Sequence, residues 1–232
     1  AGMATIGALA AISLWLSGRT PIIPEGGEQP PFRVQALSRL PGKEFQPALS
    51  RDGSKVAFLW TQSGADPPTL WIQQTNGTSP RQLTREGGAW SSPAWSPDGK
   101  RIAALRIDAQ KVTVLIIDAA AGEQHEVATL PPPRYRLDNR LLDWSPDGSV
   151  LAVSHSGKTG EPLHVSLVDL ATRQISGPIS GPATAAIDWD DVSPRFSPDG
   201  KQLAFVRRFH RLRQEVFVVP VSGGNPQQVT RA

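Results

Sequence analysis

A four-residue pattern that recurs four times constrains the fold of this chain more than any other feature of its sequence. It reads LSRDG near residue 52, WSPDG near residues 98 and 147, and FSPDG near residue 199, so the aspartates are 46, 49 and 52 residues apart. Self-similarity at such a period is typical of β-propellers, in which each blade is one repeat. When the four repeats are aligned on the aspartate, two residue types recur at fixed positions: a serine two residues before it and an alanine five residues after it.

The recurring pattern predicts a tight turn between two strands. Proline fixes φ at the second turn position, aspartate bonds to the turn backbone, and glycine accepts a positive φ. We therefore assign a structural turn role, with no catalytic, cofactor or metal role, to Asp52, Gly53, Asp98, Gly99, Asp147, Gly148, Asp199 and Gly200.

Short apolar segments after each turn predict the remaining strands of every unit. The second strands are expected at 55–60, 101–107, 150–154 and 202–206, and the third strands at 70–72, 112–118, 164–169 and 216–221. Weaker fourth strands are expected at 81–84 and 227–230, and residues 33–39 resemble a fourth strand that completes the closing blade. Four strands in about 50 residues match a propeller blade. The prediction is an all-β propeller with about four blades present, as part of a six- or seven-bladed ring.

The first 31 residues predict a separate anchoring region. Residues 1–18 carry no charged side chain, and residues 19–31 hold four prolines and two glycines. An 18-residue helix rises about 27 Å, slightly less than the roughly 30 Å hydrocarbon core, so we expect a truncated transmembrane helix. A signal peptide and an N-terminal core helix are the alternatives. The expected domains are a membrane helix at 1–18, a tether at 19–31 and a propeller at 32–232 that is incomplete at its C-terminus.

Composition excludes several functional classes. The chain has no cysteine, which removes disulfides and thiolate sites. A net charge of +3 over 232 residues is too dilute to predict nucleic-acid binding. No Gly-x-Ser-x-Gly motif of a serine hydrolase occurs, and the four histidines (125, 155, 164 and 210) are interpreted as belonging to different units without zinc spacing. No enzyme activity and no cofactor are expected.

Two charged clusters near the last repeat are candidate binding sites. Asp188, Asp190 and Asp191 are interpreted as a solvated loop rather than a calcium site. The cations Arg207, Arg208, Arg211 and Arg213 are interpreted as a solvated hairpin tip rather than an anion or protein site.

The segments PAWSPDGKRIAAL and PRFSPDGKQLAFV, with the endings RQLTR and QQVTR, resemble the WD-like repeats of TolB-like propellers. The same repeats occur in periplasmic TolB, in prolyl-oligopeptidase-like peptidases and in membrane-spanning bacterial regulators. The order of apolar segment, tether and propeller is most similar to the regulators. This resemblance implies a non-catalytic sensory or interaction domain on the periplasmic side, which binds a protein or small ligand at a propeller rim. The alternatives are the propeller of a serine peptidase and a periplasmic scaffold.

Overall fold

The computed structural model describes residues 36–77, 79–85, 87–133, 139–181, 189–209 and 213–230. The chain divides into two units, Ala1–Ala36 and Leu37–Ala232, and the propeller repeats belong to the second. The expected membrane segment and tether lie outside the described residues. No helix in the described part of the chain is long and apolar enough to cross a bilayer.

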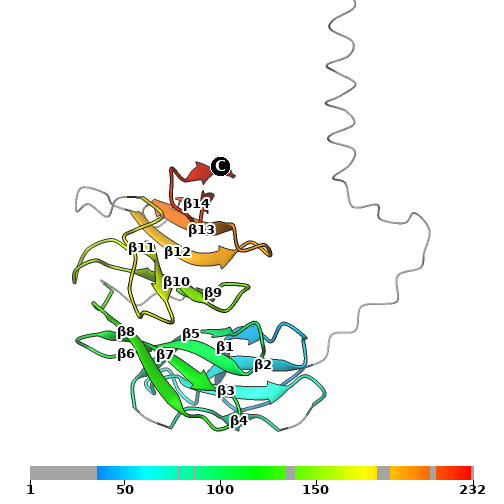
Figure 1. Ribbon diagram of the computed structural model, residues 1–232. Helices are drawn as coiled ribbons and strands as arrows, with labels where there is room; N and C mark the ends of the chain where they lie inside the picture. The colour runs from blue at the N-terminus through cyan, green and yellow to red at the C-terminus, as the bar shows by residue number, and fades with distance from the viewer. Residues whose placement is uncertain are drawn as a thin grey trace, which may run out of the picture. The chain divides into compact units, whose positions relative to one another are not determined.

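The described residues are all-β, and their strands form four antiparallel sheets that fit propeller blades (Figure 1). The first blade contains β1 (Lys43–Leu49), β2 (Lys55–Thr61), β3 (Thr69–Gln74) and β4 (Arg81–Gln82). The second contains β5 (Ala89–Trp95), β6 (Arg101–Ile107), β7 (Val112–Asp118) and β8 (Gln124–Leu130). The third contains β9 (Leu142–Trp144), β10 (Val150–His155) and β11 (His164–Asp169). The fourth contains β12 (Trp189–Phe196), β13 (Gln202–Phe209), β14 (Arg213–Pro220) and β15 (Gln227–Gln228).

In the first and fourth blades the fourth strand is shorter than the sequence suggested, because a hydroxyl group replaces part of the ladder. In the first blade, Thr84 Oγ1 accepts the backbone N–H of Leu70 at 3.0 Å. In the fourth blade, Thr230 Oγ1 accepts the N–H of Val216 at 2.9 Å. At this position of the third strand, the backbone N–H is thus satisfied by a side chain in both blades. The fourth strand ends after only two ladder residues.

The third blade departs from the expected four strands. Its place for a fourth strand holds a single bridge between Val168 and Ile175. The segment beyond contains Pro178, which lacks a backbone N–H, and hydroxyls again accept the N–H groups of β11: Ser176 Oγ from Leu167 and Ser180 Oγ from Val165, each at 2.9 Å.

The first strand of each blade lines the propeller axis. Strand β1 lies beside β5, β5 beside β9, and β9 beside β12, and Figure 1 shows the third blade between the second and the fourth. Hydrophobic clusters fill the spaces between successive blades. The alanine column lies in these spaces: Ala57, Ala103 and Ala152 are fully buried, while Ala204 is half-buried.

The chain before β1 packs against the first blade. Residues 33–35 of the expected closing strand lie outside the described residues, and residues 36–39 form no strand. Instead, the carbonyl oxygens of Leu37 and Pro41 accept hydrogen bonds from Gln73 Nε2 at 2.7 Å and Trp60 Nε1 at 2.8 Å. These two bonds fix the entry of the chain into β1.

Candidate functional site: the axial mouth

The four turns that follow the inner strands share one geometry. In each, the serine hydroxyl donates to the aspartate at 2.5–2.6 Å, and the aspartate accepts a backbone N–H two residues further on. The four glycines have φ between 64° and 78°. The serine hydroxyl is the main cause that lowers the pKa of all four aspartates, that of Asp52 to about 2. The carboxylates are therefore committed to holding the turns.

A pocket of about 300 Å³ opens where these four turns meet, and we call it the axial mouth. Every blade contributes to its lining: Leu49, Arg51, Trp95, Ser96, Pro97, Asp143, Trp144, Pro146, Phe196, Ser197 and Pro198. Leu49 is 63% exposed, which is unusual for a large apolar residue in this structure. The mouth therefore combines an apolar, proline-bordered surface with a few charged groups.

The aromatic residues of the mouth are held by the preceding blade. Trp95 Nε1 donates to the carbonyl oxygen of Ala48 at 2.9 Å. The ammonium group of Lys55 lies 5.7 Å from the centre of the Trp95 ring, and the guanidinium of Arg101 lies 5.3 Å from that of Trp144. Such cation–π contacts position both rings at the opening.

Strained backbone surrounds the axis in three of the blades. Gln46, Ser92 and Ser193 have φ of 50°, 56° and 55°, and each stands at a β-bulge directly before a proline. A residue before proline normally stays extended, and a positive φ at such a residue stores strain. These bulges were not predicted from the sequence, although a proline recurs five residues before the turn aspartate in three repeats, at positions 47, 93 and 194.

The bulges link one blade to the next. Ser92 N donates to Gln46 Oε1 at 2.7 Å, Leu141 N donates to Ser92 Oγ at 2.8 Å, and Ser193 N donates to the carbonyl oxygen of Arg140 at 2.9 Å. The strained residues thus direct polar groups from blade to blade around the axis.

Asp143 is the charged residue of the last two blades that lines the mouth, and Arg195 and Arg140 lie near it. Asp143 accepts hydrogen bonds from Arg195 Nη1 and from the backbone N–H of Phe196, each at 2.9 Å. Burial raises the pKa of Asp143, against the lowering effect of these two donors. Arg140, which donates to the carbonyl oxygen of Pro47, has its pKa lowered to about 10 by burial, so it stays protonated at neutral pH. The apolar lining of the mouth, with Arg51 in it, can bind an apolar or anionic group.

Two expectations about the charged clusters were wrong. Asp190 and Asp191 lie in β12 rather than in a loop, and Asp191 receives two hydrogen bonds from Arg207, at 2.8 and 2.9 Å. Arg207 is buried, with its guanidinium 4.6 Å from the centre of the Trp189 ring. The pair therefore joins β12 to β13 inside the fourth blade. Asp188 and Arg211 lie outside the described residues.

The expected separation of the histidines was also wrong. His155 and His164 face each other across β10 and β11, with ring centres 4.5 Å apart. The described part of the chain nevertheless contains no group of three or more residues that could hold a metal ion. His210 lies outside it.

The family model for the TolB beta propeller domain matches residues 69–232 of this chain. The chain belongs to the TolB beta propeller domain family. The repeats, the blades and the axial arrangement of inner strands agree with that assignment, and the TolB-like propeller is a non-catalytic fold.

Similar proteins include both peptidases and TolB proteins. The Tricorn protease homolog 1 of Streptomyces coelicolor is 29% identical over 86% of this chain and 18% of its own length. The Protein TolB homolog of Chlorobium chlorochromatii is 27% identical over 66% of this chain and 31% of its own. The crystal structure of TolB from Acinetobacter baumannii gives a TM-score of 0.65 at 18% identity, covering 82% of this chain and 44% of that one. The chain thus spans less than a third of these two curated relatives.

Proposed function

We propose that this propeller is a non-catalytic binding module that holds a protein segment or a small ligand at its axial mouth. The observation that carries this proposal is the convergence of all four blades on one exposed apolar pocket with cationic groups beside it. Exposed apolar surface bordered by polar groups is typical of interaction sites. Loops on a rigid scaffold can also vary without loss of the fold.

In the finer form of the proposal, the chain is the sensory or interaction domain of a membrane-anchored bacterial regulator. The uncharged residues 1–18 anchor it, the proline-rich residues 19–31 form a tether, and the propeller lies in the periplasm. Its four blades are part of a six- or seven-bladed ring. The uncharged segment and the tether support this layout, and protease added to intact spheroplasts should remove the propeller. Protection until lysis contradicts the layout.

A second candidate is the propeller of a peptidase whose catalytic domain is a different part of the protein. The similarity to the Tricorn protease homolog 1 over 86% of this chain favours it. The full-length protein should then hydrolyse peptidyl-4-nitroanilides. A full-length protein that leaves these substrates intact contradicts the peptidase proposal.

Site-directed photo-crosslinking in the source organism tests binding at the mouth. A benzoylphenylalanine replaces Leu49 at the mouth or, as a control, Val229 at the outer edge of the fourth blade; these residues are 63% and 61% exposed. We expect one discrete adduct from position 49 and none from position 229. The same adducts from both positions, or none from either, contradict a binding role of the mouth.

A further inference from the structure

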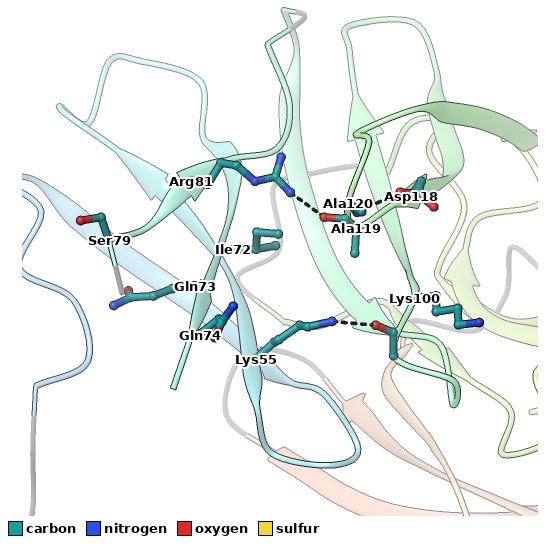
Figure 2. A pocket seen from close by; sticks show the side chains of 11 residues that line it. Lys55, Ile72, Gln73, Gln74, Ser79, Arg81, Lys100, Asp118, Ala119 and Ala120 are labelled. Carbon is teal, nitrogen blue, oxygen red and sulfur yellow. Dashed lines mark hydrogen bonds between the residues drawn. The ribbon is translucent and has the colours of Figure 1, made fainter. Parts of the chain in front are cut away.

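A second pocket, of about 520 Å³, lies between the first and second blades (Figure 2). It shares no lining residue with the axial mouth. Its lining comes from the ends of β2, β3, β4 and β7 and from the turn after β5: Lys55, Ile72, Gln73, Gln74, Ser79, Arg81, Gly99, Lys100, Asp118, Ala119 and Ala120. The proposed function of the mouth does not use this pocket, and the contact of Lys55 with the Trp95 ring links the two sites.

Three cations from different elements line the pocket. Lys55 and Arg81 extend from the first blade toward the second, whereas Lys100 lines the pocket with its ammonium group directed away from these two side chains (Figure 2). Lys55 Nζ is 3.4 Å from the carbonyl oxygen of Gly99, and Arg81 Nη2 is 2.5 Å from that of Ala119. Each contact occupies one donor, whereas an ammonium has three N–H groups and a guanidinium has five. Both side chains are held in place and keep donors for a ligand.

The one carboxylate in the lining does not balance these charges. Asp118 Oδ1 accepts the backbone N–H groups of Ala120 and Ala121 at 2.8 and 2.6 Å. These hydrogen bonds lower the pKa of Asp118, with a smaller contribution from Arg81. Asp118 is therefore ionised and committed to its own turn, and the lining carries three positive charges against one negative charge.

The cation surplus is specific to this interface and does not come from the repeat. In the second and third blades, the residue that ends the third strand and faces the start of the second strand is an aspartate, Asp118 or Asp169. In the first blade this position is Gln74, opposite Lys55. Arg81, paired with Ile72, corresponds to His125, paired with Ile116, in the second blade. The first blade thus lacks the acid and gains a permanent cation.

We infer that this pocket binds a small organic dianion, a phosphate monoester or a dicarboxylate. Lys55 and Arg81 contact its anionic groups, Lys100 adds positive charge beside them, and Ile72, Ala119 and Ala120 contact its carbon skeleton. Charge-assisted hydrogen bonds are about twice as strong as neutral ones, and guanidinium and ammonium groups are the usual partners of phosphate and carboxylate. Because the ligand contacts both blades, its binding stabilises the interface between them.

Isothermal titration calorimetry of the whole chain at constant ionic strength tests this site. The probes are glucose 6-phosphate, succinate and inorganic phosphate, with glucose as the uncharged control. We expect saturable one-site binding of glucose 6-phosphate or succinate, and the stronger of the two identifies the anionic group. Glucose should not bind. Absence of saturable binding by both organic anions overturns the proposal, as does binding of inorganic phosphate alone.

Variants locate the binding. Lys55→Gln and Arg81→Gln should each weaken the affinity by about tenfold, the effect of one charge-assisted hydrogen bond. Gln74→Asp, which supplies the acid found in the second and third blades, should also weaken it. The control is Lys201→Gln, because Lys201 is a lysine of the fourth blade that does not line the pocket. Equal loss in the Lys201 variant, or no loss in Gln74→Asp, overturns the site.

Discussion

The second and third blades share their turns but differ in how completely they are built. Their serine–aspartate turns have the same hydrogen bonds, and their glycines have φ of 64° and 78°. Yet the second blade has four strands of seven residues, whereas the inner strand of the third has three residues and its fourth strand is reduced to one bridge. The turn motif therefore determines how two strands connect and not how complete the blade becomes.

The two blades also differ in how well their buried polar atoms are satisfied. Among the described residues, unpartnered buried side-chain atoms of the third blade belong to six residues: Trp144, Ser154, His155, Ser156, His164 and Ser166. In the second blade they belong to three: Trp90, Thr113 and Gln124. Each such group costs about 1–3 kcal/mol. We infer that the third blade has the lower local stability.

Truncation of a core residue at the same position in both blades gives the largest expected effect. Ile102 and Leu151 occupy equivalent positions of the second strand and are fully buried. Either residue replaced by alanine should lower the free energy of unfolding by about 2–5 kcal/mol in urea denaturation. If the third blade is packed less firmly, it relaxes around the cavity and Leu151→Ala costs less. A larger cost for Leu151→Ala contradicts the comparison.

Acid should destabilise the third blade selectively, through its two facing histidines. Burial lowers the pKa of His155, and burial together with His155 lowers that of His164 to about 4. Unfolded histidine has a pKa of about 6.5, so the unfolded chain binds more protons between these values. The stabilising contribution is complete above pH of about 6.5 and is lost as the pH falls toward 4, by up to about 3 kcal/mol.

Urea denaturation at several pH values between 7.5 and 4.5 measures this loss. The double variant His155→Gln and His164→Gln should show a flatter dependence on pH. His125→Gln, in the second blade, is the matched control because His125 is exposed. The explanation fails if the control flattens the curve as much as the double variant does.

The sequence predicted those parts of the fold that depend on neighbouring residues. The turns and second strands followed from local columns, because proline, aspartate and glycine act within four residues. The histidine pair could have been predicted, because the strands expected at 150–154 and 164–169 are neighbours and bring residues 155 and 164 together. The bulge at Ser92 could not be predicted, because its positive φ contradicts the usual preference of a residue before proline for extended backbone. The interblade pocket could not be predicted, because Lys55 and Arg81 of the first blade come to lie beside Lys100 of the second only when the blades pack.

The turn glycines provide a test in which both blades should respond equally. A β-branched residue with positive φ is strongly disfavoured. The space around a Cβ at Gly99 is open, and at Gly148 its nearest neighbours are at ordinary contact distance, 3.7 Å or more. Gly99→Val and Gly148→Val should therefore each cost about 1–3 kcal/mol through backbone strain alone. Thermal unfolding measures both, and a difference above about 1 kcal/mol indicates that the turns are not equivalent.

Replacing two serines gives the smallest expected effect and tests directly whether the blades differ in the hydrogen bonding of their buried polar atoms. Ser92 Oγ accepts the backbone N–H of Leu141, so Ser92→Ala removes a buried acceptor and should cost about 1 kcal/mol. Ser154 Oγ is buried with no partner, and Ser154→Ala should therefore leave the stability unchanged or raise it by a few tenths of a kcal/mol. Urea denaturation of the two variants measures the difference. Equal destabilisation implies that Ser154 Oγ is satisfied by an ordered water, which places the weakness of the third blade in its shortened strands.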